Sequence, residues 1–285
     1  MAGSGGRGAP ARNPKEGVSL ALRPIDLIDI GAVGGLGPPW RAHPEAVGHV
    51  LGFEPNQPPR QDGRLWTYDS AIWHRNGRAR FFISGADGSG SSLLRQNPAW
   101  VAANFARLAD QGDRRLNRTW QERSKISRMV EIEVRTLDSV LAEFQAAAGG
   151  RRFRFLKSDT QSGEWFVLQG AQDFLARDCV GLELELFRYP LYRGMVLEDD
   201  VKAWLAERGF RVAGWSGYQA SFASQADYLF LRAAPRDAEE QALVQTIEAV
   251  YAPQGAERLI KRPPWLERLK TALKRRLPEA LRARL

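Results

Sequence analysis

The sequence predicts an α/β protein with a mostly parallel β-sheet, helices on both of its faces and an antiparallel strand near the C-terminal edge. Three observations support this fold class. Short apolar runs rich in β-branched residues, such as Ile25–Ile30, are typical of strands that are buried on both faces. Segments with apolar residues at helical spacing, such as Thr136–Ala148, lie between such runs. This alternation favours βαβ units with right-handed crossovers.

Length and composition exclude several other classes. The 285 residues allow two ordinary domains or one α/β domain with tails. Hydrophobic residues make up 44% and charged residues 26%, which excludes a wholly disordered chain. Apolar runs stay short of the roughly 18 residues that a spanning helix needs. The single cysteine, Cys179, excludes an intramolecular disulfide framework and a cysteine-based zinc site.

The first elements resemble the start of a βαβ unit. Residues 1–19 are rich in glycine, proline and charge and are predicted to be disordered. The strand Ile25–Ile30 then stops at the glycine cluster 31–37. A short helix is predicted at residues 43–49, where nearby prolines limit its length. The second strand is predicted at residues 50–54.

The rest of the body continues this alternation. We predict that it covers residues 20–250, and that the polar, arginine-rich residues 97–128 form an insertion or lid. The last two strands should form an antiparallel pair. Further strands are predicted at 65–72, 79–84, 129–134, 153–156, 180–187, 210–215 and 228–232, and further helices at 136–148, 163–170, 199–207 and 237–250.

The C-terminal tail, residues 251–285, carries the charge imbalance. Residues 258–285 contain ten Lys or Arg and two acids, so they account for the whole net charge of +8. Apolar residues from Trp265 to Leu277 follow helical spacing between basic ones, which is typical of an interfacial membrane helix. Packing on the body or on a second subunit of a homo-oligomer is an equally weighted alternative, and nucleic-acid binding ranks third.

The ends of the first two strands point to a nucleoside cofactor. Ligands of open α/β sheets bind outside the carboxyl ends of the strands. The glycines at 31–37 lack the register of a dinucleotide fingerprint, and residues 85–92 lack the lysine of a P-loop. Glu54 closes the second strand and is placed to accept hydrogen bonds from ribose hydroxyls. S-adenosylmethionine has no pyrophosphate, so its site would need this acid but not the third glycine of the dinucleotide fingerprint. The alternatives are that Glu54 is a solvated acid at a strand end and that residues 31–37 form a turn without a ligand.

A family resemblance covers about residues 26–232. Phe155–Ala171 (FLKSDTQSGEWFVLQGA) resembles the pattern F-L-K-x-D-x-[QE]-G-x-E-x-x-V-L-x-G-A of the FkbM-type family of S-adenosylmethionine-dependent methyltransferases. Three positions depart from the family pattern, namely Val33, Ser162 and Phe166. Shorter family-like pieces stand in order around it: Asp29–Ala32, Gly52–Pro55, Ser91–Leu93, Arg135–Ser139, Glu183–Glu185, Pro190–Tyr192, Gly209–Phe210 and Ala226–Phe230.

The resemblance implies a Rossmann-like class I methyltransferase fold with S-adenosylmethionine at the strand ends. The end of the first strand would line the methionine side of the cofactor, and the acid after the second strand would bind the ribose. The turn after the third strand would flank the adenine. The cofactor-binding residues implied in this way are Asp29, Gly31, Gly35, Glu54, Asp69, Ser70 and Ala71.

Methyl transfer to a hydroxyl group benefits from a general base. Asp159, Glu185 and His74 are the candidates. We favour Asp159 as the catalytic residue, with Lys157 as a second contact. For Asp159 the alternative is an acid that only orients the cofactor, and for His74 a surface turn residue is the preferred interpretation. No H-E-x-x-H motif occurs, so no metal site is predicted.

The predicted function is O-methylation of a hydroxyl on a sugar, a glycan precursor or a secondary metabolite. A non-catalytic binding or scaffold protein of the same fold, with the tail docking a membrane or a partner, is the alternative. Trp165, Tyr189 and Tyr192 could stack on an acceptor, although core packing is favoured for each. Residues 1–19 lack the apolar region of a signal peptide, which predicts a cytoplasmic location with the tail at the inner face of a membrane.

Overall fold

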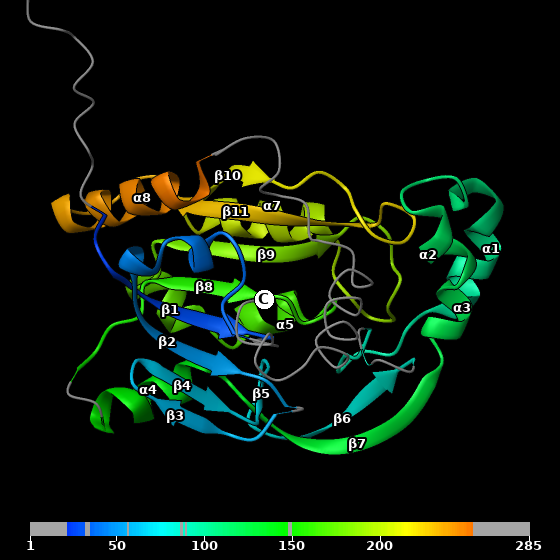
Figure 1. The fold of residues 1–285 in the computed structure, drawn as a ribbon, viewed down its shortest axis with the longest axis horizontal. Helices are drawn as coiled ribbons and strands as arrows, with labels where there is room; N and C mark the ends of the chain where they lie inside the picture. Colours follow the sequence, from blue (N-terminus) through cyan, green and yellow to red (C-terminus); the bar gives the residue numbers. More distant parts are fainter. Residues whose placement is uncertain are drawn as a thin grey trace, which may run out of the picture.

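An eight-stranded sheet in the order β10-β11-β9-β8-β1-β2-β4-β3 forms the centre of the structure (Figure 1). The structure is a computed structural model that describes residues 22–31, 35–55, 57–85, 88, 90–147 and 150–252. The strands of this sheet are β1 (Ile25–Ile30), β2 (Val47–Phe53), β3 (Arg60–Asp62), β4 (Leu65–Tyr68), β8 (Phe155–Ser158), β9 (Gly181–Phe187), β10 (Phe210–Trp215) and β11 (Gln225–Arg232).

The sheet is parallel at its centre and antiparallel at both edges. Strand β1 pairs in parallel with β2 and β8, and the parallel order extends to β4 and β9. Strand β11 runs antiparallel to β9 and β10, and β3 runs antiparallel to β4. The predicted fold class, including the antiparallel strand near the C-terminal edge, is therefore confirmed. The strand order is the Rossmann-like arrangement expected from the resemblance.

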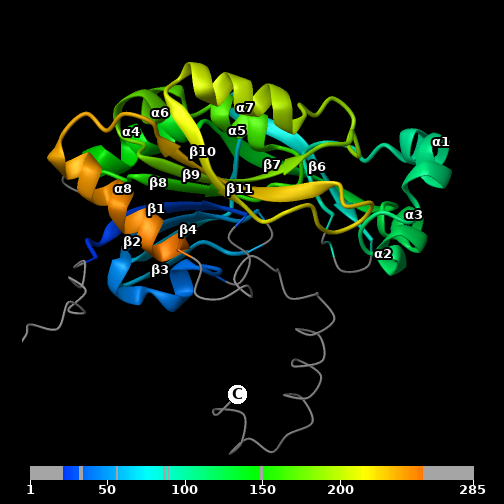
Figure 2. The same cartoon turned by 90° about the horizontal axis from the view of Figure 1, so that it is seen from above.

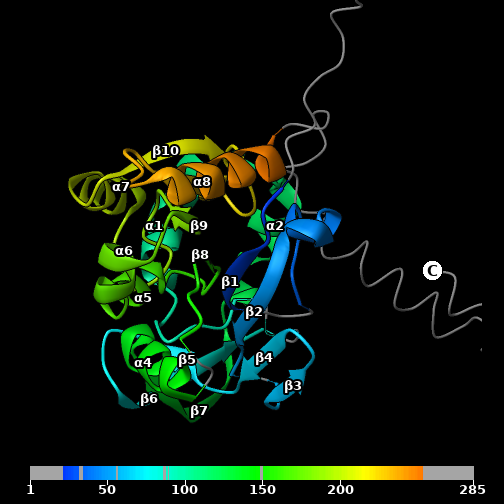
Figure 3. The same cartoon turned by 90° about the vertical axis from the view of Figure 1, so that its left-hand side faces the viewer.

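Helices cover both faces of this sheet, as Figures 2 and 3 show. One face carries α4 (Leu137–Ala147), α5 (Glu164–Gln169), α6 (Gln172–Arg177) and α7 (Glu198–Glu207). The other face carries α8 (Ala238–Tyr251) together with the short 3₁₀ turns η1 (Trp40–Ala42) and η2 (Pro44–Ala46).

Each covered face has its own buried apolar cluster. Leu137, Val140 and Phe144 of α4 lie in one cluster with Ile28 and Leu156 of the sheet. On the opposite face, α8 contributes apolar side chains to a cluster with the 3₁₀ turns and the sheet. Strands with apolar side chains on both faces are the signature of a sheet buried between helical layers. This explains why the runs of apolar residues in the sequence were continuous and not alternating.

Most predicted elements are confirmed within two or three residues, but the helix expected at 43–49 is wrong. The chain there forms only η1 and η2, and β2 already starts at Val47, so His49 lies in a strand. Proline has no amide hydrogen and restricts the residue before it, and Pro38, Pro39 and Pro44 leave no room for an α-helical turn. The stretch expected as one strand at 65–72 is divided between β4 and β5 (Ala71–Ile72).

A second, three-stranded sheet lies beside the carboxyl ends of the first. It consists of β5, β6 (Gly77–Ser84) and β7 (Ile126–Arg135) in the order β5-β7-β6. The region predicted as an insertion or lid forms α1 (Pro98–Leu108), α2 (Arg114–Arg118) and α3 (Trp120–Arg123). These three helices gather at one end of the molecule, on the right in Figure 1.

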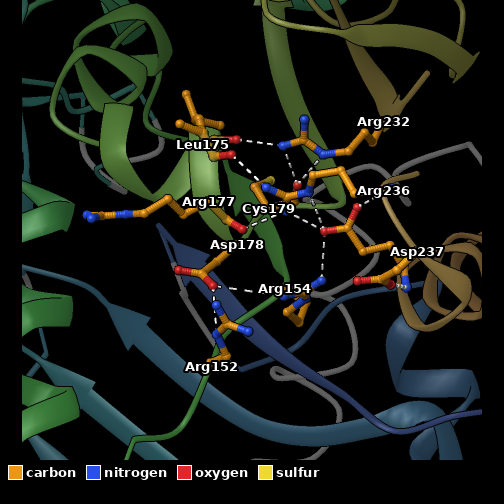
Figure 4. A network of polar contacts seen from close by, with 11 residues as sticks. Arg152, Arg154, Leu175, Arg177, Asp178, Cys179, Arg232, Arg236 and Asp237 are labelled. Carbon is orange, nitrogen blue, oxygen red and sulfur yellow. Dashed lines mark hydrogen bonds and ion pairs between the residues drawn. The ribbon is translucent and has the colours of Figure 1, made fainter. Parts of the chain in front are cut away.

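A network of charged groups ties the amino ends of β8 and β9 to α8 (Figure 4). Arg154, just before β8, donates from Nη2 to Glu240 Oε1 of α8 at 3.0 Å. Arg236 donates from its backbone N and from Nε to the same carboxylate, each at 2.9 Å. Arg232 of β11 donates to the carbonyl oxygens of Leu175 and Cys179. The network lies at the edge of the sheet opposite the strand ends on which the candidate site is built.

The tails at 1–19 and 253–285 lie outside the described residues, as does Val33. In the part of the chain that is described, none of the helices combines the length and the apolar character needed to cross a bilayer.

Candidate functional site

A cavity of about 410 Å³ opens at the carboxyl ends of β1, β2 and β8. Because these strands are adjacent and parallel, their last residues meet at one edge of the sheet. Seven of the residues predicted as cofactor-binding or catalytic line this cavity: Asp29, Gly31, Gly35, Glu54, Ala71, Lys157 and Asp159.

Asp29 and Lys157 face one another across neighbouring strands. Asp29 lies near the end of β1 opposite Lys157 of β8, and Lys157 Nζ is 3.6 Å from Asp29 Oδ1. Asp29 is 2% exposed, and its Oδ1 has no hydrogen-bond partner among the described residues. Burial raises the pKa of Asp29, an effect that the Lys157 charge opposes and the nearby Asp159 charge reinforces. A buried carboxylate with unused acceptor capacity is suited to a cationic or hydrogen-bond-donating ligand.

Glu54 and two glycines form the side of the cavity next to β2. Glu54 follows β2, is 6% exposed, and its backbone N donates to Tyr68 O at 3.0 Å. Gly31 has a φ of +83°, and a Cβ added to it would lie 2.2 Å from the carbonyl oxygen of Asp159. Gly35 also has a positive φ, but no atom lies within 4 Å of its Cβ position. Gly31 is thus required by the contact between β1 and the residue after β8, whereas Gly35 leaves space at the cavity wall.

Two carboxylates are bridged by one amide at the far end of the cavity. Gln161 Nε2 donates to Asp159 Oδ1 at 3.1 Å and to Glu185 Oε2 at 2.6 Å. Asp159 follows β8, whereas Glu185 lies in β9 and is 1% exposed. The amide neutralises part of the repulsion between the carboxylates and holds both side chains in place.

Aromatic and aliphatic side chains line the other part of the cavity. Trp73 follows β5, and its ring stacks on Phe166 of α5 with centroids 4.2 Å apart and planes at 22°. Phe166 thus supports the cavity wall through an aromatic contact. A flat, apolar surface of this kind suits the ring system of a ligand such as adenine. The apolar residues lining the cavity include Phe53, Ile72, Trp73, Phe81 and Leu93.

The segment 159–164 has a strained backbone and a buried acid. Gln161 and Ser162 have φ values of +54° and +79°, a region that favours glycine. Ser162 therefore adopts the conformation expected of the glycine that the family pattern has at this position. Glu164 Oε1 accepts from Thr160 N at 2.7 Å and from Thr160 Oγ1 at 2.9 Å, which closes this turn.

Burial raises the pKa of Glu164 to about 7, because hydrogen bonds from Thr160 only partly offset the loss of solvation and the Asp159 charge adds to it. The folded state therefore holds a proton that the unfolded chain has released between pH 4.5 and about 7. The contribution of Glu164 to stability is complete below pH 4.5 and is lost as the pH rises through 7.

The substitution Glu164→Gln should remove this dependence. The amide keeps Oε1 as an acceptor for Thr160. We therefore expect the free energy of unfolding of the variant to exceed that of the natural chain by up to about 3 kcal/mol at pH 8 and by almost nothing at pH 4.5. Chemical denaturation of both proteins across this pH range measures the difference. A constant difference at all pH values would show that Glu164 does not titrate in this window.

Four of the residues predicted as cofactor-binding or as candidate bases do not line this cavity, namely Asp69, Ser70, His74 and Glu185. Asp69 is exposed and Ser70 is 4% exposed in the turn between β4 and β5, and only Ala71 of that turn reaches the cavity wall. His74 is also outside the lining, and partial burial lowers its pKa with help from the neighbouring Arg75 charge. These positions place Asp69 and Ser70 away from direct contact with a ligand in this cavity.

Other lining residues are not among the predicted site residues. Arg41, Trp73, Phe81 and Thr160 line the cavity. Trp73 stands directly after a predicted strand end, which could have drawn attention to it. Phe81 lies in the interior of β6 and Arg41 in η1, where only the tertiary arrangement brings them to the site.

The three aromatic residues considered for acceptor stacking have different surroundings. Trp165 packs against the main cluster and contacts Trp204 with centroids 5.3 Å apart. Tyr189 packs on the cluster near α1. Tyr192 is buried, and its hydroxyl donates to Gly90 O at 3.1 Å. Burial raises the pKa of Tyr192, and the charges of Glu185, Glu164 and Asp159 raise it further, so it remains a neutral phenol.

Comparison with known proteins gives a family match. The model of the Methyltransferase FkbM domain family matches residues 38–212, which is more than half of the chain. A comparison with curated proteins finds no match. Among solved structures, a proposed tRNA (m1A22) methyltransferase from Streptococcus pneumoniae is similar at 10% identity, with 92% of this chain and 86% of that chain covered and a TM-score of 0.34. The matched residues 38–212 run from the turn before η1 into β10 and contain most of the cavity lining.

Proposed function

Because the chain belongs to the FkbM methyltransferase family, we propose that this methyltransferase takes its methyl group from S-adenosylmethionine and transfers it to a hydroxyl group of a sugar, a glycan precursor or a secondary metabolite. The observation that supports the proposal most directly is the convergence of Asp29, Glu54 and Asp159 on one cavity at the strand ends. Adjacent parallel strands of an open α/β sheet present their ligands at this edge.

The polar and apolar groups that line the cavity fit this cofactor. The buried acceptor atom of Asp29 suits the ammonium group of the methionine part, and Glu54 suits the two ribose hydroxyls. The apolar wall around Trp73 suits the adenine. The cavity wall also carries Asp159, so negative charge lies where a positively charged sulfonium would be placed. These assignments account for both the polar and the apolar parts of the lining.

When bound, S-adenosylmethionine supplies a methyl group on a positively charged sulfur, and the transfer is an in-line displacement. We assign Asp159 as the general base, at the end of the cavity next to Gln161. It accepts the proton of the acceptor hydroxyl as the carbon–oxygen bond forms and the carbon–sulfur bond breaks. Lys157 stands beside Asp29 and helps to keep that carboxylate ionised. The chain thereby aligns the reacting groups and excludes water from them.

Calorimetry with S-adenosylhomocysteine tests the cofactor assignment. The natural chain should bind it, and Glu54→Ala should weaken binding by about 1–3 kcal/mol, or about 5- to 150-fold, because a buried hydrogen bond to a charged group is lost. Glu45→Ala is the matched control, because Glu45 is an exposed acid outside the cavity. Binding that is unchanged in Glu54→Ala would remove Glu54 from the site, and a natural chain that does not bind at all would leave a non-catalytic scaffold as the better reading.

We also propose that the protein is cytoplasmic and that residues 258–285, which lie outside the described residues, attach it to the inner face of a membrane. Their ten basic residues would each contribute about 1 kcal/mol near an anionic leaflet. Deletion of 258–285 should therefore abolish binding to anionic liposomes at low salt while the affinity for S-adenosylhomocysteine stays the same. Liposomes of neutral lipid are the control. A full-length chain that ignores anionic liposomes would instead favour docking on a second subunit or another protein.

A further inference from the structure

A second cavity adjoins the one described above. It has a volume of about 440 Å³, and the side chain of Gln161 lines both cavities. Its walls come from the end of β9, from α2 and α3, and from the segment between β10 and β11. Helices α2 and α3, at the right-hand end of Figure 1, thus supply one wall of a cavity next to the proposed methyl-transfer site. A molecule in this cavity would lie next to Asp159, on the other side of the Gln161 side chain.

The lining of the second cavity combines a mostly apolar surface with many hydrogen-bonding side chains. Among its polar side chains, the planar amide and carboxylate groups of Gln, Glu and Asp predominate, together with one arginine, Arg123. The lining contains two carboxylates, Asp113 and Glu185, and this single cation. It therefore offers no excess of positive charge for an anionic ligand. The aromatic rings of Trp120 and Tyr192 add flat surfaces. Polar groups in several directions around an aromatic surface suit a molecule with many hydroxyl groups.

Glu185 accepts a hydrogen bond on each of its carboxylate oxygens. Gln161 Nε2 donates to its Oε2 at 2.6 Å, and Gln225 Nε2 donates to its Oε1 at 2.5 Å. Both amide groups come from loops or strand ends that also line the cavity. A carboxylate oxygen has a second acceptor position, so Glu185 can receive a ligand hydroxyl without giving up either amide.

Two further observations mark this cavity as a binding site. Gln96 is 9% exposed and lines the cavity, and its Oε1 has no hydrogen-bond partner among the described residues. Every non-glycine residue with a positive φ in the described part of the chain also belongs to two segments at this cavity. Strained backbone and unused polar groups concentrate at functional sites. The strained residues are Gln161, Ser162, Ala220, Phe222 and Ala223.

We infer that the second cavity binds the methyl acceptor, and that this acceptor is an uncharged, polyhydroxylated molecule of the sugar class. Glu185 and Gln225 bind its hydroxyl groups, and one hydroxyl faces Asp159 past Gln161. This inference rests on the proposed methyl transfer. It adds to it the place of the acceptor, its chemistry and the residues that select it.

A single introduced thiol can report on occupancy of this cavity. The chain has one cysteine, Cys179, which is buried, and burial raises its thiol pKa to about 12, so it should not react. Leu116→Cys places a thiol on the wall of the second cavity, and Ala213→Cys places one on the exposed strand β10 as a control. Both proteins, saturated with S-adenosylhomocysteine, are treated with a methanethiosulfonate reagent, and the labelling rate is followed by intact mass.

Methyl glycosides of common hexoses are the probe. They should slow labelling of the Leu116→Cys thiol but not of the Ala213→Cys thiol. In the Leu116→Cys protein, the additional substitution Glu185→Gln should weaken protection, because a charged hydrogen bond to the glycoside is lost. The glycoside concentration that halves the labelling rate should rise about tenfold or more. S-adenosylhomocysteine affinity should stay the same in every variant.

Other outcomes separate the two proposals. Protection by catechol without protection by the glycosides would overturn the sugar class, and protection by glucose 6-phosphate alone would overturn an uncharged acceptor. Labelling that none of these compounds slows would overturn the acceptor cavity itself, while the proposed methyl donor site would stand if S-adenosylhomocysteine still binds. A natural chain that does not bind S-adenosylhomocysteine would instead contradict the proposed function.

Discussion

Asp159→Asn should reduce kcat for methyl transfer by about 10²- to 10⁴-fold. The amide cannot take the proton of the acceptor hydroxyl, but it keeps an oxygen that can accept from Gln161 Nε2, which now donates at 3.1 Å. The cavity shape is therefore preserved, and the effect should fall on kcat with little change in KM. Steady-state kinetics with a hydroxylated acceptor measures both constants.

The affinity for S-adenosylhomocysteine distinguishes the two roles considered for Asp159. If Asp159 is the base, calorimetry should give nearly the same affinity for the natural chain and for Asp159→Asn. Weaker binding with an unchanged kcat would show that the carboxylate only orients the cofactor. Asp62→Asn is the matched control, because Asp62 lies on the exposed edge strand β3 in an ion pair with Arg60.

Glu240→Gln should destabilise the folded chain by about 3–5 kcal/mol, the range for a buried ion pair that loses one partner. Glu240 is 1% exposed and binds Arg154 and Arg236 in the network of Figure 4. Burial disfavours its ionisation, but hydrogen bonds and charge from Arg236, with the charge of Arg154, outweigh this and lower its pKa to about 2. Without the carboxylate, Asp178, at 3.9 Å, is the one acid that stays paired with Arg154 in the described part of the chain.

Urea denaturation at neutral pH measures this loss, and its pH dependence supplies a second test. A carboxyl whose folded-state pKa is lowered stabilises the fold above its unfolded value of 4.5, and that stabilisation disappears as the pH falls toward 2. The difference between the natural chain and Glu240→Gln should therefore shrink across this range. Asp173→Asn is the control: its pair with Arg177 is exposed, and we expect a change below about 0.5 kcal/mol. Equal losses in both variants would contradict the role given to burial.

Periodicity and strand-end chemistry predicted most of the fold and the acids that line the first cavity. The buried strands and the amphipathic helices follow from local patterns of apolar residues, because such patterns show which faces must leave water. Asp29, Glu54 and Asp159 were found because each stands at the carboxyl end of a predicted parallel strand. The helix expected at 43–49 failed because three prolines outweighed a weak apolar pattern. The strand β3 and helix α6 were missed because they are short.

The rest of the cavity lining comes from residues that are distant in the sequence from these strand ends. Trp73 and Phe81 reach the first cavity from β5 and β6 of the smaller sheet, and no local signal marks that approach. Glu185 had been considered as a base, but its bridge through Gln161 to Asp159 appears only when β8 and β9 lie side by side. Asp69 and Ser70 were predicted to bind the cofactor. Whether they reach the cavity depends on the path of the turn after β4, and the spacing of residues along the chain does not define that path.

The sequence by itself determined the class of the sheet, the order of its elements, the family and the acids at three strand ends. These depend on local periodicity, on charge at particular positions and on a contiguous motif, all of which can be read along the chain. Only the tertiary structure decided which side chains share a cavity, that Glu164 is buried enough to raise its pKa to about 7, and that a second cavity adjoins the first. Cavities and desolvation are properties of the space between segments, and the packing of distant segments sets that space.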